Sequence, residues 1–328
     1  MKRDKLETQL FKDNKGQEYR KAEHIDLEAS KNFLQSKGFK VEDLKQTWRC
    51  VHGVVQKDGI ASFFKMGSTA GICDRIRNEV SFNTGLNEEI SKRGITNFVT
   101  PNIGDTGKYG DLFYYIADYY PGPLLLNSSQ DKPDAEFEGN LEQVVDINMS
   151  LLEMPKLDLP RDQEFSGKSE EDCANRMIEI YSTFAKQVEE LGMDELVEVL
   201  EEFRNNFKFG LNHGDFTPWH LIKNDIKSRW VLIDSEHASN NDPKFYDIAY
   251  FYHRLYTSSH GADGARRYLD LIKARLGGAE KIEEFKRSIR PILAARIIGG
   301  YWDAKTAGES DYRIHNQLKQ EFLSGKTP

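Results

Sequence analysis

Cysteines are scarce in this sequence, and their number and spacing argue against two kinds of cross-linked framework. The three cysteines are Cys50, Cys73 and Cys173, and no Cys-x-x-Cys pair occurs. An odd number of cysteines argues against a disulfide framework, and the missing pair argues against a zinc knuckle. Free thiols fit a reducing compartment.

Long apolar runs and an excess of basic residues are also missing. No window reaches the roughly 18 apolar residues that a membrane-spanning helix needs. Met1–Asp13 is mostly polar and lacks the apolar core of a signal peptide. The net charge is −8 and no basic stripe is visible, whereas general nucleic-acid-binding proteins usually carry one. We therefore expect a cytoplasmic protein that binds neither a membrane nor nucleic acid; its oligomeric state is left open.

The sequence does contain enough apolar material for a sizeable core. Of its 328 residues, 38% are hydrophobic and 30% are charged, a composition that is ordinary for a globular protein. The length suggests one large domain or two packed lobes. Because proline and glycine are not in excess, we expect no long disordered segment.

The first third of the chain is predicted to form a short helix followed by β-strands. Asp26–Gln35 has the apolar spacing of a helix, and Gly38 follows it as a stop signal. Lys57-Asp58-Gly59 is a hairpin turn signal between two apolar runs. A second helix is predicted over Asp74–Leu86. The predicted strands cover Val41–Trp48, Arg49–Gln56, Ile60–Met66, Asn97–Asn102 and Asp111–Ala117.

The remaining two thirds are predicted to be mostly helical. Tyr120-Pro121-Gly122-Pro123 breaks the earlier pattern, Trp230–Ile233 is a short buried strand, and Pro291 predicts a bend in the last helix. Helices are predicted at Leu141–Leu152, Met177–Ala185, Leu196–Phe203, Asp247–Leu255 and Ile282–Ile297. A β-rich part followed by an α-rich part predicts an α+β fold. We place the lobes at residues 1–120, including a polar and helical extension over 1–39, and at residues 121–328.

The strongest chemical signal lies between Leu211 and Asp247. His213-Gly214-Asp215 sits in a polar loop, and Asp234, nineteen positions after Asp215, ends a buried apolar strand. Loops at strand ends hold reactive carboxylates away from the core. Phosphoryl transfer needs a metal that bridges the phosphates, a cation on them, and a carboxylate oriented on the attacking hydroxyl.

The segment HGDFTPWH, followed by IDSEHASNNDPKFYDIAYF, resembles the catalytic and metal-binding segments of the aminoglycoside phosphotransferase and choline kinase superfamily. The family pattern is His-x-Asp-x4-Asn, then a strand that ends in Ile-Asp, then a helix that starts with Tyr-Asp-Leu-Ala. His213, Asp215, Asp234 and Tyr246-Asp247-Ile248-Ala249 match it. The resemblance implies a protein-kinase-like two-lobe fold, with Asp215 as the base or orienting carboxylate and Asp234 as the residue that holds Mg²⁺.

The resemblance extends to the first lobe. Lys65 closes the third predicted strand, where such kinases place the lysine that binds the nucleotide phosphates, and Glu79 lies where its ion-pair partner belongs. Asp118, Tyr119 and Tyr120 resemble the hinge that bonds adenine through its backbone. The resemblance therefore implies ATP or GTP as the phosphate donor, with Mg²⁺ or Mn²⁺ as the cofactor.

Two departures from the family pattern bear on activity. No Gly-x-Gly-x-x-Gly motif precedes Lys65, although members of the superfamily often lack it. The family asparagine, which offers its amide oxygen to magnesium, is His220 here. Magnesium prefers oxygen ligands, whereas imidazole favours softer metals. His220 is therefore a ligand of a different ion, a sign of a weak metal site or lost activity, or a residue that packs the loop.

Several motif residues also have structural interpretations. We assign His213 with Asp215 to the catalytic motif, and we expect its ring to brace the loop by hydrogen bonds rather than to transfer protons. We expect Asp247 to cap the helix that it begins. The aromatic residues within Tyr246–Tyr256 are more typical of a core than of a cation–π cage. Glu236 could face the metal or the acceptor. Tyr301–Asp303 could line an acceptor pocket, although helix-end packing is the favoured interpretation.

The distance between the motifs favours a small acceptor. The helix at Asp247 starts thirteen residues after Asp234, which leaves little room for the activation segment of a protein kinase. We therefore expect an ATP-dependent phosphotransferase that moves the γ-phosphate to a hydroxyl of an aminoglycoside, an amino alcohol or a sugar-like molecule. A catalytically impaired nucleotide-binding protein is one alternative. The other is a metal-dependent hydrolase, whose ligands would be His213, Asp215, His220, Asp234 and His237.

Overall fold

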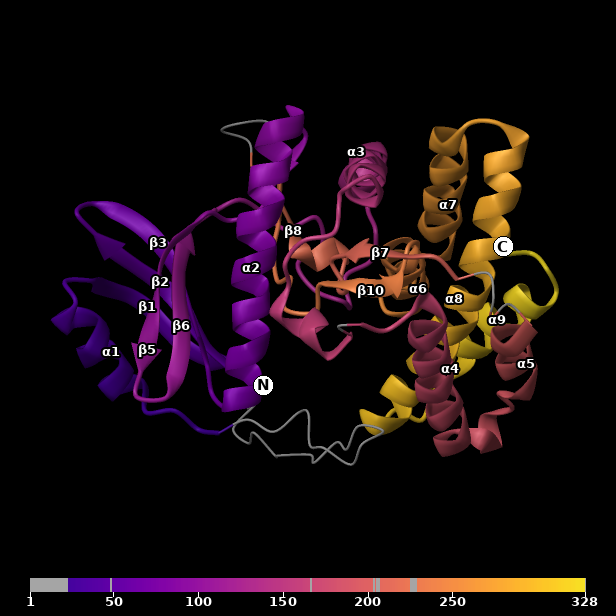
Figure 1. The fold of residues 1–328 in the computed structure, drawn as a ribbon, viewed down its shortest axis with the longest axis horizontal. Coiled ribbons are helices and arrows are strands. Elements are labelled where there is room, and N and C mark those ends of the chain that lie inside the picture. Colours follow the sequence, from indigo (N-terminus) through magenta and orange to yellow (C-terminus); the bar gives the residue numbers. More distant parts are fainter. Residues whose placement is uncertain are drawn as a thin grey trace.

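The computed structural model describes residues 23–47, 49–165, 167–202, 204, 207–224 and 229–327. The first part of the predicted polar extension lies outside these described residues. Within them, the chain forms a sheet-rich lobe followed by a mostly helical lobe (Figure 1). The predicted α+β two-lobe fold is therefore confirmed.

The first lobe is built on a five-stranded antiparallel sheet of order β1-β2-β3-β6-β5. Asp58 and Gly59 join β2 to β3 with positive φ angles of 53° and 79°, which is the backbone of the tight hairpin turn that the sequence predicts. All these strands except β5 are predicted from the sequence. Their bounds are β1 (Lys40–Thr47), β2 (Cys50–Lys57), β3 (Ile60–Gly67), β5 (Ile103–Tyr109) and β6 (Leu112–Asp118).

The two faces of this sheet meet different helices. α1 (Leu27–Ser36) packs on the outer face, and α2 (Ala70–Arg93) packs on the face toward the second lobe (Figure 1). In β3, Phe64 and Met66 join the core on the α1 side. Because successive side chains of a strand point to opposite faces, Lys65 points to the α2 side.

α2 brings a carboxylate to that same face of the sheet. Ile72 and Ile76 pack on the sheet from α2. Glu79 follows Ile72 by about two helical turns and so lies on the same side of the helix. The helix extends beyond both ends of the predicted Asp74–Leu86. Lys65 and Glu79 are therefore brought face to face by the two periodicities of strand and helix.

Two small sheets follow and carry the motif loops. β4 pairs in parallel with β9, which pairs antiparallel with β8, while β7 pairs antiparallel with β10. The strand predicted at Asn97–Asn102 is thus short, and it joins the second lobe instead of the first sheet. β7 ends just before His213, and β9 ends shortly before Asp234. The bounds are β4 (Phe98–Val99), β7 (Phe209–Asn212), β8 (Leu221–Asn224), β9 (Arg229–Leu232) and β10 (Ser239–Pro243).

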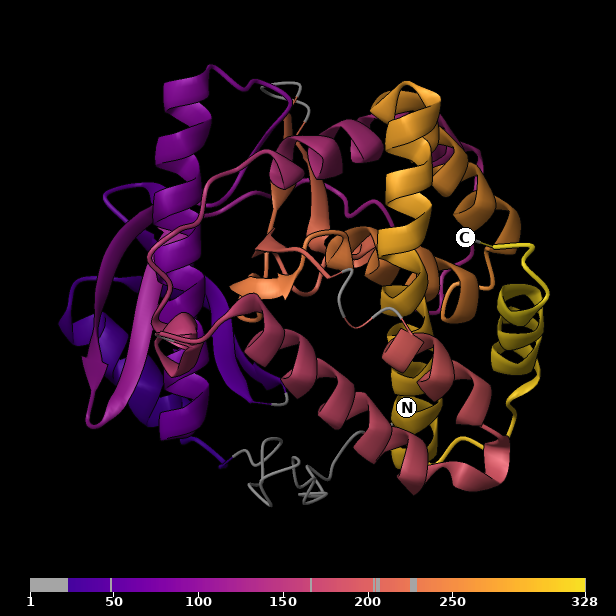
Figure 2. The same ribbon diagram turned by 45° about the vertical axis from the view of Figure 1, so that its right-hand side comes forward.

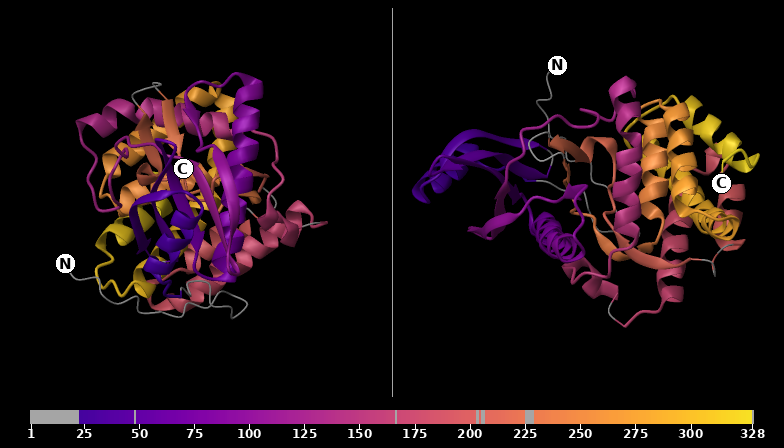
Figure 3. Two further views of the ribbon diagram at one scale, coloured as in Figure 1. Left: turned by 90° about the vertical axis from the view of Figure 1, so that its left-hand side faces the viewer. Right: turned by 90° about the horizontal axis from the view of Figure 1, so that it is seen from above.

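The helical lobe is organised around α8, which packs against α4, α5 and α6. Pro291, where a bend is predicted, lies inside this helix, which continues past it. Figure 2 shows the long α8 in front of the lobe, and Figure 3 shows the first-lobe sheet projecting from one side of the helices. α7 and α9 are not predicted from the sequence. The helices are α3 (Ala135–Leu152), α4 (Glu170–Gln187), α5 (Asp194–Glu202), α6 (Tyr246–Thr257), α7 (Ala262–Leu276), α8 (Ala279–Thr306) and α9 (Arg313–Leu323), with short 3-10 turns at Pro160–Phe165, Glu189–Leu191 and Pro218–His220.

The described helices include none whose length and apolar character would let it cross a membrane.

Gly53 in β2 offers a test of the strand packing in the first lobe. A Cβ atom at this position would collide with the backbone carbonyl of Asp43 in β1. We expect Gly53→Ala to lower the free energy of unfolding by about 1–3 kcal/mol, the usual cost of overpacking, in chemical denaturation. Gly71→Ala is the control, because the space around Gly71 in α2 is open. Equal stability of Gly53→Ala and the unchanged protein would contradict the close approach of β1 and β2.

Candidate active site

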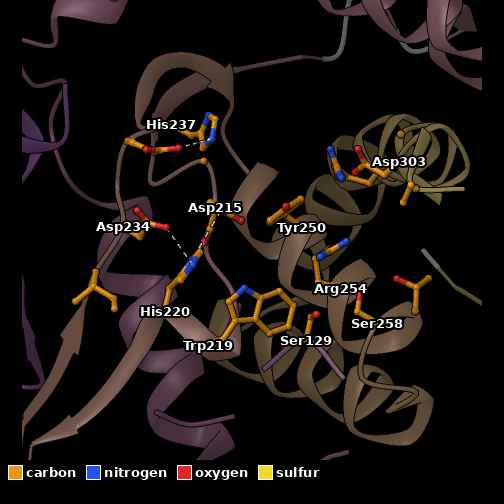
Figure 4. Close-up of a pocket in the computed structure, with 18 of the residues that line it drawn as sticks. Ser129, Asp215, Trp219, His220, Asp234, His237, Tyr250, Arg254, Ser258 and Asp303 are labelled. Atoms are coloured by element: carbon orange, nitrogen blue, oxygen red, sulfur yellow. Dashed lines mark hydrogen bonds and ion pairs between the residues drawn. The ribbon is translucent and has the colours of Figure 1, made fainter. Parts of the chain in front are cut away.

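A cleft of about 1600 Å³ runs between the first-lobe sheet and the helical lobe. It holds the predicted site residues from both lobes and from the segment that joins them. Figure 4 shows Asp215 in the middle of this cleft, with Asp234 and His220 on one side and Tyr250 and Arg254 on the other. Every predicted site residue except His213 lines the cleft: Lys65, Glu79, Asp118, Tyr119, Tyr120, Asp215, His220 and Asp234.

The Lys65 ammonium group links the two lobes. It donates to Glu79 Oε2 at 2.8 Å and to Asp234 Oδ1 at 2.7 Å, and Lys65 is only 7% exposed. Burial lowers the pKa of Lys65, but the carboxylates of Asp234 and Glu79 outweigh burial and hold that pKa well above its usual value. A permanent positive charge is therefore fixed where a carboxylate from each lobe meets it.

The two carboxylates around Lys65 differ in their environment. Burial raises the pKa of Glu79 above its usual value in spite of the opposing effect of Lys65. Burial would also raise the pKa of Asp234, but Lys65 and His220 outweigh it and hold that pKa at about 2. The Asp234 side chain is 36% exposed, whereas that of Glu79 is 3% exposed. Asp234 is therefore the ionised carboxylate that a ligand in the cleft can reach.

Asp234, which follows the end of β9, has an uncommon backbone conformation. The Ile233 N–H still donates to the His220 carbonyl at 3.0 Å, so strand pairing continues up to the preceding residue. Asp234 then has a φ of 65°, in the left-handed region where aspartate is enriched among non-glycine residues. This turn brings its carboxylate to Lys65 instead of leaving it along the strand.

Asp247 holds the loop His213–Asp215 in place through its carboxylate. Its Oδ2 accepts from the His213 N–H at 2.7 Å, and its Oδ1 accepts from the Gly214 N–H at 2.9 Å. α6 begins at Tyr246 without a side-chain cap. The predicted capping role of Asp247 is therefore wrong, because its carboxylate is directed to the loop that carries Asp215. Its role is still structural, since it supplies acceptors for two buried backbone donors.

His213 braces the same loop through its ring. Nδ1 accepts from the Asp215 N–H at 3.3 Å, so Nε2 carries the proton and donates to the Ile233 carbonyl at 3.1 Å. Burial, helped by the nearby His220, lowers the pKa of His213 to about 4, which keeps the ring neutral near pH 7. Because both nitrogens are engaged and the residue is 0% exposed, the geometry favours the bracing role over the catalytic one.

His220 stands between the two motif carboxylates. Its Nδ1–H donates to the backbone carbonyl of Asp215 at 2.8 Å, and its Nε2 lies 3.3 Å from Asp234 Oδ2. Burial lowers the pKa of His220, but Asp215 and Asp234 outweigh burial and raise it. One ligand atom from each of Asp215, His220 and Asp234 lies within 4.8 Å of the others.

This donor set fits a divalent cation. Imidazoles that bind metals usually donate their other N–H to a backbone carbonyl or a carboxylate, and His220 does so through Nδ1, which leaves Nε2 as the possible ligand atom. Two carboxylates and one imidazole suit Mn²⁺, since Mg²⁺ prefers oxygen ligands. The wider hydrolase set is not assembled: His213 is used in its loop, and His237 Nε2 lies 3.3 Å from Glu236.

Glu236 makes a second ionic contact between the lobes. It is 4% exposed, and its Oε1 accepts from Arg49, in the turn between β1 and β2, at 2.5 Å. Lys65 lies 3.9 Å from its other oxygen. Burial raises the pKa of Glu236, but His237 and Lys65 outweigh burial and hold it well below its usual value. Glu236 therefore ties the first lobe to the loop that follows Asp234.

Asp118, Tyr119 and Tyr120 connect β6 to the second lobe. Asp118 is engaged within the chain: its N–H donates to the Asn102 carbonyl at 3.0 Å, and its carboxylate accepts from the Asn102 side chain at 2.7 Å. Within the described part of the chain, the N–H groups of Tyr119 and Tyr120 have no backbone acceptor. These two peptide groups are therefore available to a ligand, while Asp118 braces the segment.

The predicted aromatic cluster divides between core and cleft. Phe251, Tyr252 and Tyr256 are 0% exposed and belong to the core, as predicted. Tyr246 and Tyr250 instead line the cleft. They lie one turn apart on α6 and stack with ring centroids 5.8 Å apart.

Sequence reasoning missed the residues that form the far wall of the cleft. Arg254 follows Tyr250 by one helical turn and lies beside Trp219. Arg296 comes from α8 and also lines the cleft. The four-residue spacing of Tyr250 and Arg254 on the helix after the motif was the available signal.

No protein-family model matches the sequence, and no curated protein matches it. Solved structures do match. A crystal structure of aminoglycoside phosphotransferase APH(4)-Ia has a TM-score of 0.62 at 14% identity, over 91% of this chain and 98% of that chain. A thermostable mutant of that enzyme, in a ternary complex with AMP-PNP and hygromycin B, gives 0.60 at 15% identity over 90% and 98%. Another, with ADP and hygromycin B, gives 0.59 at 14% identity over 90% and 96%.

The chain has the aminoglycoside phosphotransferase fold. The likeness extends over nearly the whole length of both chains, whereas the motifs that carry the sequence resemblance lie within Lys65–Ala249. The predicted protein-kinase-like arrangement of two lobes is therefore confirmed at the level of the fold.

Asp247 provides a test of how this kinase-like fold supports its motif loop. Asp247→Asn replaces one accepting oxygen with an amide that faces a buried loop N–H. We expect the free energy of unfolding to fall by about 1–3 kcal/mol, the cost of an unsatisfied buried donor, in urea denaturation. Asp263→Asn, in the exposed first turn of α7, is the matched control and should change stability by less than about 0.5 kcal/mol. Equal effects of the two substitutions would show that the loop does not depend on Asp247.

Proposed function

We propose that the protein is an ATP-dependent phosphotransferase that moves the γ-phosphate to a hydroxyl group of a small molecule. The observation that carries this proposal is the Lys65 ammonium group, held between Glu79 and Asp234 in the cleft that also contains Asp215. A fixed cation, a carboxylate for the metal and a carboxylate for the attacking hydroxyl are the groups that phosphoryl transfer needs. The likeness in fold to aminoglycoside phosphotransferase APH(4)-Ia supports the same reading.

In this proposal each residue acts from its observed position. Lys65 binds the phosphates of the nucleotide, and Glu79 keeps the ammonium group extended into the cleft. The N–H groups of Tyr119 and Tyr120, which have no backbone acceptor among the described residues, would bond the base. Asp215 orients the acceptor hydroxyl and receives its proton while the acceptor oxygen bonds to the γ-phosphorus and the bond to the β-phosphate oxygen breaks.

Asp234, His220 and Asp215 are the residues that would hold a divalent cation. Such a cation neutralises charge on the phosphates when it is bound. His220 presents Nε2 because its Nδ1 is committed to the Asp215 carbonyl. The proposed cofactor is therefore Mn²⁺ or Mg²⁺, with His220 favouring Mn²⁺.

The short chain segment between Asp234 and Asp247 supports a small acceptor. The residues from Asp234 to Asp247 form one loop and the short β10, which pairs with β7. Protein kinases place a long activation segment here to receive a peptide. The short connection leaves no such platform, and the cleft beside Asp215 suits a small hydroxylated molecule better than a peptide.

Asp215→Asn tests the proposed division between nucleotide binding and chemistry. ATP or GTP, each with Mg²⁺ or Mn²⁺, should raise the melting temperature of the unchanged protein, since a ligand at a hundred times its Kd adds about 2.7 kcal/mol. Asp215→Asn should keep that shift but lose about 10²–10⁴-fold in slow nucleotide hydrolysis, with water in place of the acceptor. Asp111→Asn, in the exposed turn between β5 and β6, is the control. The absence of any nucleotide-dependent shift in the unchanged protein would contradict the proposed function.

His220→Asn tests the metal assignment. The unchanged protein should bind its nucleotide more tightly with Mn²⁺ than with Mg²⁺, because an imidazole nitrogen suits the softer ion. His220→Asn should move this preference toward Mg²⁺ on the order of tenfold, the size of effect seen for substitutions around metal sites, in calorimetric titrations with each metal. His24→Asn, at an exposed position before α1, should leave the preference unchanged. An unaltered ratio in His220→Asn would remove His220 from the ligand set.

A further inference from the structure

The wall of the cleft beyond Asp215 is rich in cationic and imidazole groups. Arg254 from α6, Arg296 from α8 and His315 from α9 all line it. Figure 4 shows Arg254 and Tyr250 on the side of Asp215 opposite to Asp234. This wall, defined by Arg254, Arg296 and His315, is called the arginine wall below. It lies on the acceptor side of Asp215, away from the proposed nucleotide and metal groups.

Arg254 has no charged partner within the described part of the chain. Its guanidinium group lies over the Trp219 ring, 5.4 Å from the centroid. Its Nε is buried and has no hydrogen-bond partner in the residues that the structure describes. Arginine in a cleft usually binds a carboxylate or phosphate through its planar set of N–H groups. Arg254 therefore presents donors that the chain itself does not use.

Arg296 is more deeply buried and likewise makes no direct ion pair within the described residues. It is 7% exposed, and its Nη1 donates only to the hydroxyls of Tyr181 and Tyr246, each at 3.2 Å. Its guanidinium group lies 4.4 Å from the centroid of Tyr250, and its Nε has no partner among the described residues. Burying a charge without a counter-ion is costly. A ligand that supplies a negative charge would remove that cost.

Within the described residues, the carboxylates near this wall supply less negative charge than the two arginines supply positive charge. Asp303 lines the cleft and acts electrostatically on Arg296, but its single charge cannot offset two guanidinium groups. Asp311 is held by Arg313 at 2.6 Å. Glu309 lies at the exposed rim of the cleft. The inner part of the wall is therefore left with net positive charge.

His315 adds an unused polar atom to the same wall. Its Nδ1 is buried and has no hydrogen-bond partner among the described residues. Burial and the nearby Arg254 lower the pKa of His315 to about 4, so its ring is neutral near pH 7. A neutral imidazole can still donate one hydrogen bond, which suits an acceptor-rich anionic group.

The rings of Trp219 and Tyr250 each contact an arginine of the wall, which disfavours a cage for an ammonium group. Such a cage needs open ring faces, but Arg254 lies over Trp219 and Arg296 lies over Tyr250. Phe184 stacks on Trp302 with ring centroids 4.3 Å apart. The same arginines would also repel a cationic acceptor. The wall thus disfavours amine-rich acceptors on both counts.

We infer that the arginine wall binds an anionic group, a carboxylate or a phosphate, of the phosphoryl acceptor. Arg254 makes the direct contact, and Arg296 behind Tyr250 adds a second positive charge. The inference rests on the proposed function, because it places the acceptor hydroxyl at Asp215. The acceptor class is then a small hydroxylated acid or a sugar phosphate.

The spacing on α6 limits the size of this acceptor. Figure 4 shows Tyr250 between Asp215 and Arg254, and Arg254 lies one helical turn after Tyr250, a rise of about 6 Å. A hydroxyl at Asp215 and an anionic group at Arg254 are therefore separated by a short carbon skeleton. During transfer the hydroxyl loses its proton to Asp215 and gains the γ-phosphate of the nucleotide, while the anionic group is unchanged.

Calorimetric titration without nucleotide tests this inference independently of catalysis. Two sets of probes differ mainly in charge: glycerol, serinol, glycerate and glycerol 3-phosphate, and glucose, glucosamine, gluconate and glucose 6-phosphate. At least one anionic probe should bind the unchanged protein ten times more tightly than the neutral and cationic members of its set. Comparison of the carboxylate with the phosphate probe in each set then identifies which anion is preferred.

Variants of Arg254 complete the test. Arg254→Gln should weaken the preferred anionic probe at least tenfold, and Arg254→Lys should recover part of the loss, because it keeps the charge but not the paired donors. Arg267→Gln removes an arginine paired with Glu138 on the outer surface and should change nothing. Equal or tighter binding of neutral or cationic probes, or an unchanged affinity in Arg254→Gln, would overturn the inference.

The two proposals fail in different ways. Anion binding that depends on Arg254, without any nucleotide-dependent shift in melting temperature, would keep the anionic site and remove the phosphotransferase. Phosphorylation of neutral or cationic acceptors alone would keep the phosphotransferase and overturn the anionic site.

Discussion

The rest of the site depends on one buried ammonium group. Lys65 reaches the cleft because strand alternation turns it away from the α1 core, and Glu79 meets it because helical spacing turns that residue to the same face. Its third partner, Asp234, comes from the other lobe. Separating the lobes would leave a buried charge short of a partner, which typically costs several kcal/mol. The approach of the two lobes and the position of the Asp234 carboxylate are therefore one electrostatic arrangement.

The motif loop is held by a second set of contacts that all come from elsewhere in the chain. Asp247 supplies two acceptors from α6, and the His213 ring bonds to the backbone after β9. Buried backbone donors must find acceptors, and here the acceptors belong to the helix and strand that flank the cleft. The loop that carries Asp215 is thus positioned by Asp247 and His213, neither of which lines the cleft.

Sequence patterns predicted the structural features that depend on residues close together in the chain. The alternation in β1, β2, β3 and β6, the Asp58–Gly59 turn and the kinase-like motif are local features, and the structure places them as expected. The pairing of β4 with β9 and the bracing by Asp247 join distant segments, so no local pattern shows them. The arginines of the cleft were missed for a related reason: an arginine on a helix is usually solvated, and only the packing of α6 against α8 turns Arg254 and Arg296 inward.

The two halves of the cleft are under different physical constraints. On the side of Lys65 each of these cations has a carboxylate partner: Lys65 contacts Glu79 and Asp234, and Arg49 contacts Glu236. On the acceptor side Arg254 and Arg296 rest on aromatic rings, which stabilise a cation far less than a carboxylate does when solvent is excluded. A fold can be shared by proteins of different specificity, and here the second half is formed by side chains on α6 and α8. The proposed acceptor is therefore inferred from the half with Arg254 and Arg296, where the described residues supply too little negative charge.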